Sequence, residues 1–163
     1  MIQKQFMYVG TILMGFMSLQ SCNQPKHLEE KPTQEIVQPT NVMFEKIKEG
    51  YLTGNGEEKI SEGGVVIRSQ EEWDVLAKKM NSVNQTIDEK SFDFERVTVV
   101  AYFDKIRGSG GYSVDVSSIT ETDKTTVVAI KKTPSDGYDI EIMTQPYVIV
   151  QIAQTENAIH FQD

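Results

Sequence analysis

The second half of the chain is a series of short β-type segments that follow one another closely. Val97–Phe103 is β-branched and aromatic along its whole length, which predicts a central strand buried on both faces. Apolar and polar residues alternate over the next segment, which predicts a strand with Tyr112, Val114 and Val116 pointing inward. Further strands are predicted at Thr125–Lys131, at Tyr138–Ile142, at Tyr147–Ile152 after an interruption by Pro146, and at Ala158–Phe161. So many closely spaced strands favour an antiparallel sandwich or a small barrel.

One helix is predicted in front of these strands. Its start is a capping box, in which Ser69 accepts from the amide of Glu72 and the Glu72 side chain reaches back to the amide of Ser69. The apolar residues of one helical stripe are Trp73, Leu76, Ala77 and Met80, which predicts an amphipathic helix packed on the sheet. Earlier strands are predicted at 42–52, broken by Gly50, and at 65–67. The expected fold class is therefore mainly β, or α+β by element count.

The first 21 residues have the pattern of a bacterial lipoprotein signal peptide. Lys4 supplies the positive start, and Phe6 to Leu19 is an uncharged, mostly apolar run too short to span a bilayer as a helix. The run ends in Leu-Gln-Ser-Cys, which resembles the lipobox in which the cysteine thiol receives a diacylglyceryl group. We therefore predict that residues 1–21 are cleaved and that acylated Cys22 anchors the chain in a lipid bilayer. The alternative is an ordinary secretory signal.

Residues 22–41 are predicted to be the lipidated cysteine and a flexible tether. The segment carries three prolines, several charges and few apolar residues, which is typical of a linker. Residues 23 to 41 would reach about 25 Å as a flexible coil. Residues 42–163 then form a single β-rich domain. We expect it in the bacterial cell envelope, at the outer membrane, facing the periplasm or the cell surface.

Charge and residue inventory exclude several function classes. A formal net charge of −8 argues against nucleic acid as a partner, because phosphate binding needs clustered cations. One cysteine and two histidines far apart in sequence leave no disulfide, no cysteine-based zinc site and little for catalysis, so we expect neither an enzyme nor a cofactor. A paired-carboxylate hydrolase would have to draw on Asp104, Asp115, Asp136, Asp139 and Glu141.

Three glycines, Gly108, Gly110 and Gly111, precede Tyr112 in the middle of the chain. This stretch is not a nucleotide-binding loop, because a strand follows where a helix must begin and a P-loop lysine is missing. It is therefore predicted to connect a hairpin from Phe103 to Tyr112, and two roles stay open. The glycines either let Tyr112 enter the core or form a partner-binding surface. The residues of that surface would be Gly108, Gly110, Gly111, Tyr112, Pro146 and Tyr147.

Several segments together resemble one known family. They are Ser-Gln-Glu-Glu-Trp at 69–73, Phe-Asp-Phe at 92–94, Gly-Gly-Tyr-Ser-Val at 110–114 and Gln-Pro-Tyr-Val-Ile-Val at 145–150. In this order they resemble the PrcB C-terminal domain family over residues 65–152, with Ser109 where the family usually has threonine. The resemblance implies a small, non-catalytic, β-rich domain on an exported lipoprotein. The family is named after a lipoprotein subunit that helps a bacterial surface protease complex to assemble or remain stable.

The function expected from these features is that of a lipid-anchored, non-catalytic module that binds another envelope protein, such as a protease. One alternative is a protease inhibitor of the chagasin type, which also presents a Gly-aromatic loop near a Pro-aromatic loop. Gln145 stands where that family has arginine before the proline, and its Asn-Pro-Thr-Thr-Gly segment is missing. The other alternative is a structural or ligand-binding lipoprotein.

Overall fold

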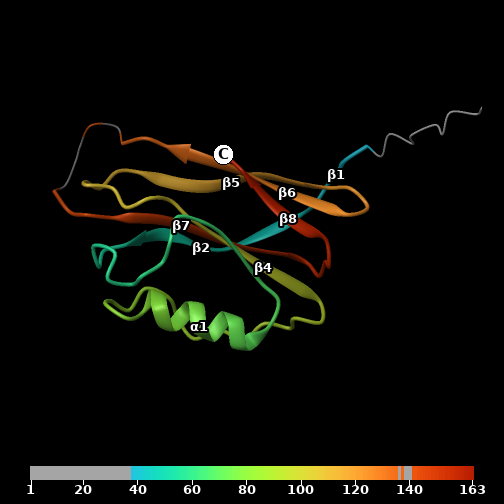
Figure 1. Ribbon diagram of the computed structural model, residues 1–163, viewed down its shortest axis with the longest axis horizontal. Helices are drawn as coiled ribbons and strands as arrows, with labels where there is room; N and C mark the ends of the chain where they lie inside the picture. The colour runs from blue at the N-terminus through green and yellow to red at the C-terminus, as the bar shows by residue number, and fades with distance from the viewer. Residues whose placement is uncertain (1–37, 136, 138–140) are drawn as a thin grey trace, which may run out of the picture. The chain divides into compact units, whose positions relative to one another are not determined.

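The computed structural model describes residues 38–135, 137 and 141–163. Within them the chain forms one helix and two four-stranded sheets, with the strand orders β1-β5-β6-β8 and β2-β7-β4-β3 (Figure 1). The elements in chain order are β1 (Thr40–Asn41), β2 (Phe44–Leu52), β3 (Gly63–Ile67), α1 (Gln70–Met80), β4 (Val97–Phe103), β5 (Ser113–Glu121), β6 (Thr125–Thr133), β7 (Gln145–Ala153) and β8 (Ala158–Gln162). All pairings are antiparallel except β6 with β8. This confirms a mainly β, α+β sandwich, and the sheets do not close into a barrel.

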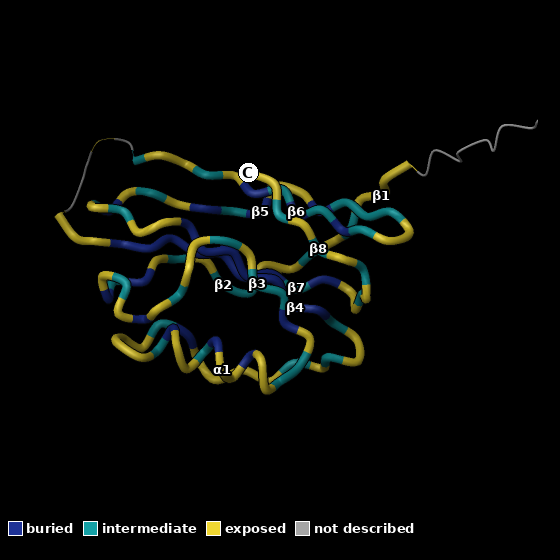
Figure 2. Tube along the Cα trace, in the orientation of Figure 1, coloured by how far each residue is buried: buried dark blue, intermediate teal, exposed yellow. Residues whose placement is uncertain are grey.

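The strands β4 and β7 lie at the centre of their sheet and bury both faces. Alternate residues point to opposite sides, so Val99, Ala101 and Phe103 pack toward α1 while Val100 and Tyr102 pack toward the other sheet. Two core clusters result, one on each side of this sheet. Figure 2 shows the buried stretches of β4 and β7 in the layer between α1 and the other sheet. The central position predicted for Val97–Phe103 is thus confirmed, and its unbroken apolar composition follows from double burial.

The helix α1 packs on the outer face of that sheet through the predicted stripe. Trp73, Leu76 and Met80 are buried, and Phe92 meets Trp73 edge-on with ring centroids 4.9 Å apart. Ser69 caps the helix by accepting from the amide of Glu72 at 3.2 Å. The second half of the predicted capping box differs, because the Glu72 carboxylate accepts from the amide of Arg68 instead of that of Ser69. The Glu72 side chain therefore pairs with the backbone amide of Arg68, one residue before the helix cap.

The strand β2 runs without a break through Gly50, where the sequence predicted an interruption. Gly50 pairs with Tyr147, and a Cβ at this position would lie 3.3 Å from the Tyr147 hydroxyl oxygen. The glycine therefore leaves room for a core side chain inside the strand. The irregularity of β2 lies instead between Lys46 and Lys48, where the register with β7 shifts.

Two groups of predictions fall on parts of the chain without a structural description. The signal peptide, Cys22 and most of the tether lie outside the described residues. So does the stretch 138–140 of the predicted strand at Tyr138–Ile142, whose described part at 141–142 is not a strand. Among the described residues, no helix is long and apolar enough to cross a bilayer.

Candidate functional site: the glycine loop and the end of the sandwich

The segment from Asp104 to Tyr112, here called the glycine loop, carries the chain from one sheet to the other. It leaves β4, which pairs with β3 and β7, and enters β5, which pairs with β1 and β6. The predicted hairpin is therefore wrong, because the strands on either side belong to different layers. A hairpin within one sheet and a crossover between two sheets look alike in the local sequence, since each needs only two strands and a turn.

Backbone contacts hold the start of the loop against the segment before β7. The amide of Asp104 donates to the carbonyl of Pro146 at 2.8 Å, which extends the β4–β7 ladder by one residue. Arg107 and Thr144 then exchange two hydrogen bonds, at 2.7 and 3.0 Å. The Thr144 hydroxyl donates to the carbonyl of Ser109 at 3.0 Å. Four hydrogen bonds thus fix the first half of the loop on its neighbour.

A buried ion pair fixes the same half of the loop from inside. The Asp104 carboxylate is 1% exposed, and its Oδ2 accepts from Nε of Arg107 at 2.8 Å and also from Nη2. The other oxygen, Oδ1, has no hydrogen bond but lies 3.4 Å from Nζ of Lys132. One buried carboxylate is therefore shared by two cations from different elements, which offsets the cost of its burial.

Lys132 on β6 joins this pair to the C-terminal strand and the loop before β3. Its ammonium contacts the carboxylates of Asp163 and Glu62 and lies 5.4 Å from the centre of the Tyr102 ring. The hydrogen bond to Asp163 raises the pKa of Lys132 above its ordinary value, so Lys132 stays charged throughout the physiological range. The same hydrogen bond lowers the pKa of Asp163. The network thus ties both sheets together at this end of the sandwich.

Pro146 lies inside β7 rather than before it, which corrects the predicted interruption. A proline in a central strand removes one ladder hydrogen bond, because it has no N–H. In this register the missing donor would have faced the carbonyl of Asp104. That carbonyl accepts instead from Nε2 of Gln145 at 3.0 Å, and the same amide donates to the carbonyl of Ile60 at 3.1 Å. The side chain before the proline therefore supplies the donor that the proline lacks.

The three glycines of the loop have different surroundings. Gly111 has φ +84°, a left-handed conformation that side chains rarely adopt, and a Cβ there would lie 2.5 Å from Oγ of Ser135. Gly110 is buried, whereas Gly108 is exposed, with open space where a Cβ would stand. Gly111 is thus the glycine that the backbone requires, and Gly108 is the one that tolerates a side chain.

Tyr112 does not enter the core, although the alternating pattern predicted it inward. It is half-buried, lies just before β5 and belongs to neither core cluster. The guanidinium carbon of Arg107 lies 4.6 Å from the centre of its ring, a cation–π contact. The strand proper begins at Ser113, and Val114 and Val116 are buried as predicted. Tyr112 therefore covers the ion pair rather than filling the sandwich.

Pro146 and Tyr147, the other half of the predicted contact surface, are both buried. Tyr147 is 2% exposed, packs against Phe103 at a ring-centroid distance of 6.0 Å, and has its hydroxyl pKa raised by burial. A buried strand cannot present these residues to a partner. The chagasin-type interpretation thereby loses the second of the two exposed loops on which it depends.

The surface that is exposed at this end is apolar and was not predicted. We call it the terminal surface: Tyr51, Ile106, Ile142 and Met143, which are 58%, 40%, 43% and 42% exposed. Tyr51 pairs with Pro146, Met143 precedes Thr144, and Ile106 precedes Arg107 and lies over Gly56. All four therefore come from segments that the contacts above bring together. A contiguous exposed apolar surface marks an interaction site, and these four residues are the candidates for one at this end of the sandwich.

The loop that supports Ile106 contains a buried carboxylate. Glu58 is 3% exposed, and its Oε1 accepts from the amide of Gly54 at 2.7 Å, whereas Oε2 has no hydrogen bond among the described residues. A Cβ on Gly54 would collide with this carboxylate. Asn55 and Gly56 both have positive φ, the conformation that an Asn-Gly pair favours in tight turns.

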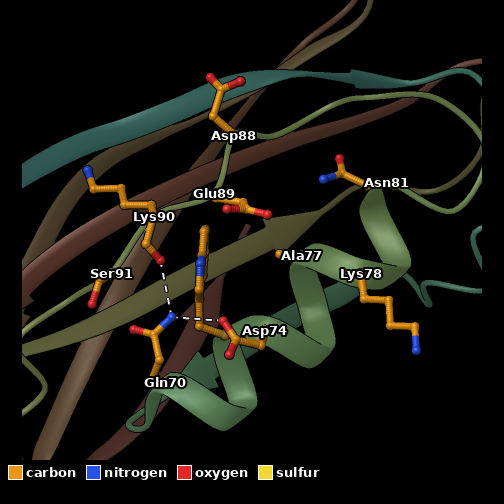
Figure 3. Close-up of a pocket in the computed structure, with 10 residues that line it drawn as sticks. Gln70, Asp74, Ala77, Lys78, Asn81, Asp88, Glu89, Lys90 and Ser91 are labelled. Carbon is orange, nitrogen blue, oxygen red and sulfur yellow. Dashed lines mark hydrogen bonds between the residues drawn. The ribbon is translucent and has the colours of Figure 1, made fainter.

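A hollow lies beside α1, between the helix and residues 88–91. It has a volume of about 650 Å³ and is lined by polar side chains that surround Trp73. Figure 3 shows Gln70 joined to Asp74 and to the carbonyl of Lys90, by hydrogen bonds of 2.8 and 3.1 Å, while Lys78 points away. The Gln70 amide is thus used in holding the 88–92 segment to the helix, since Phe92 also donates to it.

The described carboxylates considered for catalysis differ in their partners and exposure, and none of them pairs with another carboxylate. Asp104 is paired as above, Asp115 pairs with Lys46 at 2.8 Å, and Glu141 is exposed. Asp136 and Asp139 lie outside the described residues. Among those described, no group of three or more histidine, cysteine or acidic residues could hold a metal ion.

Comparison with known protein families identifies the segment that builds this end of the sandwich. Residues 98–153 match the family model described as PrcB C-terminal. This segment is similar to the PrcB C-terminal family. The match confirms the resemblance over about a third of the chain of 163 residues, from β4 to the end of β7. It is shorter than the expected 65–152 and does not include β3 or α1. No curated protein and no solved structure matches the chain.

The matched segment contains the glycine loop, Lys132, Thr144 and the Gln145–Pro146 pair. Three of the four terminal-surface residues also lie within it. Sequence reasoning missed the roles of Arg107, Lys132 and Thr144, which are ordinary polar residues in loop or outward positions. The available signal was the spacing of Asp104 and Arg107, an opposite-charge pair three residues apart directly after a fully apolar strand.

Proposed function

We propose that this chain is a lipid-anchored accessory protein of the bacterial cell envelope that binds an exported protein, such as a protease, through its terminal surface. The coarse part of this proposal, an accessory role connected with a protease complex, is what the PrcB C-terminal family implies. The surface used and the anchor are inferences from this chain's own residues. Fold alone does not fix a function, so both need direct tests.

The observation that carries the proposal is an exposed apolar surface on a rigid support. Ile106 and Met143 stand next to Arg107 and Thr144, whose backbones are joined by two hydrogen bonds. The ion pair of Arg107 with buried Asp104 holds this junction from inside. A surface ordered before binding loses less conformational entropy when a partner docks, which favours affinity. A plain flexible loop would need none of these contacts.

The anchor and the tether explain how such a surface would meet a partner. Acylation at Cys22 would hold the chain at the membrane, and residues 23 to 41 would let the domain reach about 25 Å from it. Confinement near a membrane raises the effective concentration of any partner exported to the same place. A modest affinity at the terminal surface is then sufficient.

The experiment is capture of partners from membranes of cells that express tagged chains, after brief chemical crosslinking. Ile106→Asp and Met143→Asp place a charge on the terminal surface, and Val83→Asp is the matched control, because Val83 is 41% exposed but lies after α1. A buried aliphatic side chain contributes about 1.5–3 kcal/mol. We therefore expect both variants to capture the partner at least tenfold less well, while the control captures it normally. Equal capture by all chains would contradict the proposal.

The anchor is tested separately with Cys22→Ala. We expect the wild-type chain to take up a palmitate analogue in growing cells and to sediment with membranes. Cys22→Ala should do neither, and its signal peptide should remain uncleaved or be cleaved elsewhere. A variant that sediments with membranes and is labelled as before would show that the chain is held by other means.

A further inference from the structure

The strand β3 is an edge strand without the features that usually protect an edge. It ends the order β2-β7-β4-β3, and its sequence Gly-Gly-Val-Val-Ile has no charge. Its backbone pairs with β4 on one side, and no other backbone hydrogen bond among the described residues involves 63–67. The opposite edge, β2, carries Glu45, Lys46, Lys48 and Glu49 and a register shift, which discourage further pairing. Only one of the two edges is therefore open to another strand.

An apolar groove runs along this open edge beside α1. Two adjoining hollows of about 320 and 350 Å³ share Val65, Glu72 and Val75 as lining residues. Val65 packs toward the α1 side of the sheet, and Val75 is 54% exposed although it lies in the middle of the helix. The edge strand and the helix thus form one apolar strip, with Val65 of β3 and Val75 of α1 at its centre.

The charges along the groove change sign from one end to the other. Lys59 and Lys79 line the end where β3 begins. Glu62 lines the same end, but its carboxylate is paired with Lys132 at 3.6 Å, so the two lysines set the sign of the charge there. Glu71 lines the end where β3 finishes, and the following Arg68 turns its guanidinium away, to the carbonyls of Thr155 and Asn157. An occupant must therefore be acidic at the first end, apolar in the middle and basic at the second.

A second copy of this chain meets all of these requirements. A two-fold axis through Val65 sets β3 antiparallel to its copy, with Gly63 opposite Ile67 and Gly64 opposite Val66. The lysine end of each groove then faces the acidic end of the other, and the two Val75 side chains approach the axis. Such an interface uses the same patch on both chains, as two-fold dimers do. An unrelated extended peptide would need its charges in this particular order to fit equally well.

We propose that β3 pairs antiparallel with β3 of a second copy, which joins the two sheets across a two-fold axis at Val65. The main-chain hydrogen bonds of the added strand give affinity, and the groove beside α1 gives register. The dimer leaves the terminal surface of each copy free. If the chain proves not to dimerise through β3, the proposed function is unaffected. If the terminal surface proves not to bind a partner, the dimer proposal is unaffected.

The test is crosslinking of the full-length chain in membranes with a short bis-maleimide. Val75→Cys should give a covalent dimer on a denaturing gel. Lys78→Cys, on the side of α1 that lines the other hollow, should give at least fivefold less. The wild-type chain, whose one cysteine is Cys22, supplies the background. Adding Lys79→Glu to Val75→Cys should lower the dimer at least fivefold, and Glu71→Lys added to both should restore it.

Three results would overturn the dimer. One is no adduct from Val75→Cys although a maleimide dye labels that cysteine. The second is an adduct with a different protein, which would make the groove a site for another partner. The third is a dimer that does not respond to Lys79→Glu or does not recover with Glu71→Lys. Circular dichroism of each variant checks that the helix remains intact.

Discussion

Replacing Gln145 by leucine removes the side-chain amide that stands in for the missing N–H of Pro146. Two carbonyls then lose their donor, those of Asp104 and Ile60. Asp104 is fully buried, so water cannot replace the amide there, whereas half-buried Ile60 remains partly within reach of solvent. The variant therefore isolates one contact inside the central sheet.

The size of the effect follows from these surroundings. A buried carbonyl without a donor costs about 1–3 kcal/mol, and loss of a more accessible hydrogen bond costs about 0.5–1.5 kcal/mol. Oε1 of Gln145 is buried and has no hydrogen bond among the described residues. Removing it raises the free energy of unfolding by about 1 kcal/mol, which offsets part of this loss. We expect Gln145→Leu to lower the free energy of unfolding by about 1–3 kcal/mol.

Pro146→Ala should partly rescue this variant, because alanine supplies the N–H that faces the carbonyl of Asp104. In the native background the same substitution gains nothing, since Gln145 already occupies that carbonyl, and it loses about 0.4–1 kcal/mol of proline rigidity together with packing. The two changes should therefore be coupled by about 1 kcal/mol or more in a double-mutant cycle.

The assay is urea unfolding of a chain that begins at residue 23, followed by the fluorescence of Trp73. This is the chain's one tryptophan, and it is buried in the core. The slope of the unfolding curve should stay constant while the midpoint moves. A loss below about 0.5 kcal/mol for Gln145→Leu, or two substitutions that simply add, would refute the role assigned to the amide.

Three further outcomes are expected from the same assay. Gly111→Ala should lower the unfolding free energy by about 1–3 kcal/mol because of its positive φ and the contact its Cβ would make, whereas Gly108→Ala should change it by less than about 0.5 kcal/mol. Arg107→Lys keeps the charge but loses the two-pronged bond to its buried carboxylate, and should cost about 1–3 kcal/mol. The hydrogen bond from Lys132 lowers the pKa of Asp163 below 3.8, so its stabilisation is present above that pH and is lost as pH falls through the folded pKa. Urea midpoints of Asp163→Asn measured below about pH 4 should therefore fall less steeply than those of the wild type.

The sequence predicted the layers of this fold better than its connections. The unbroken apolar composition of Val97–Phe103 indicates that both faces of this strand are buried. The apolar stripe through Trp73 indicates which face of α1 is buried. The local sequence does not determine which sheet the strand after the glycine loop joins. A hairpin and a crossover both consist of a strand, a turn and a second strand. The interruption predicted at Pro146 was wrong for the same reason. The donor that replaces its missing N–H is the Gln145 side chain, which bonds to a residue 41 positions away in the sequence.

The structure places the residues of the predicted contact surface differently from what their sequence pattern indicated, and binding through them stays a prediction. The glycine loop is at the exposed end of the sandwich, but the aromatic residues expected to form its surface are Tyr147, which is buried, and Tyr112, which is half-buried against Arg107. The exposed residues are the apolar neighbours of the fixing contacts, such as Ile106 and Met143. Exposure of an apolar side chain depends on how loops meet in space, and periodicity within one segment carries no information about that.

The most direct measurement is photo-crosslinking from the terminal surface in living cells. A photoreactive amino acid is placed at position 106, and for comparison at position 83, in the full-length chain. We expect one prominent adduct from position 106, identified by mass spectrometry as an exported protein, with little or none from position 83. An adduct pattern that is the same for both positions would contradict the claim that this surface is where the chain binds its partner.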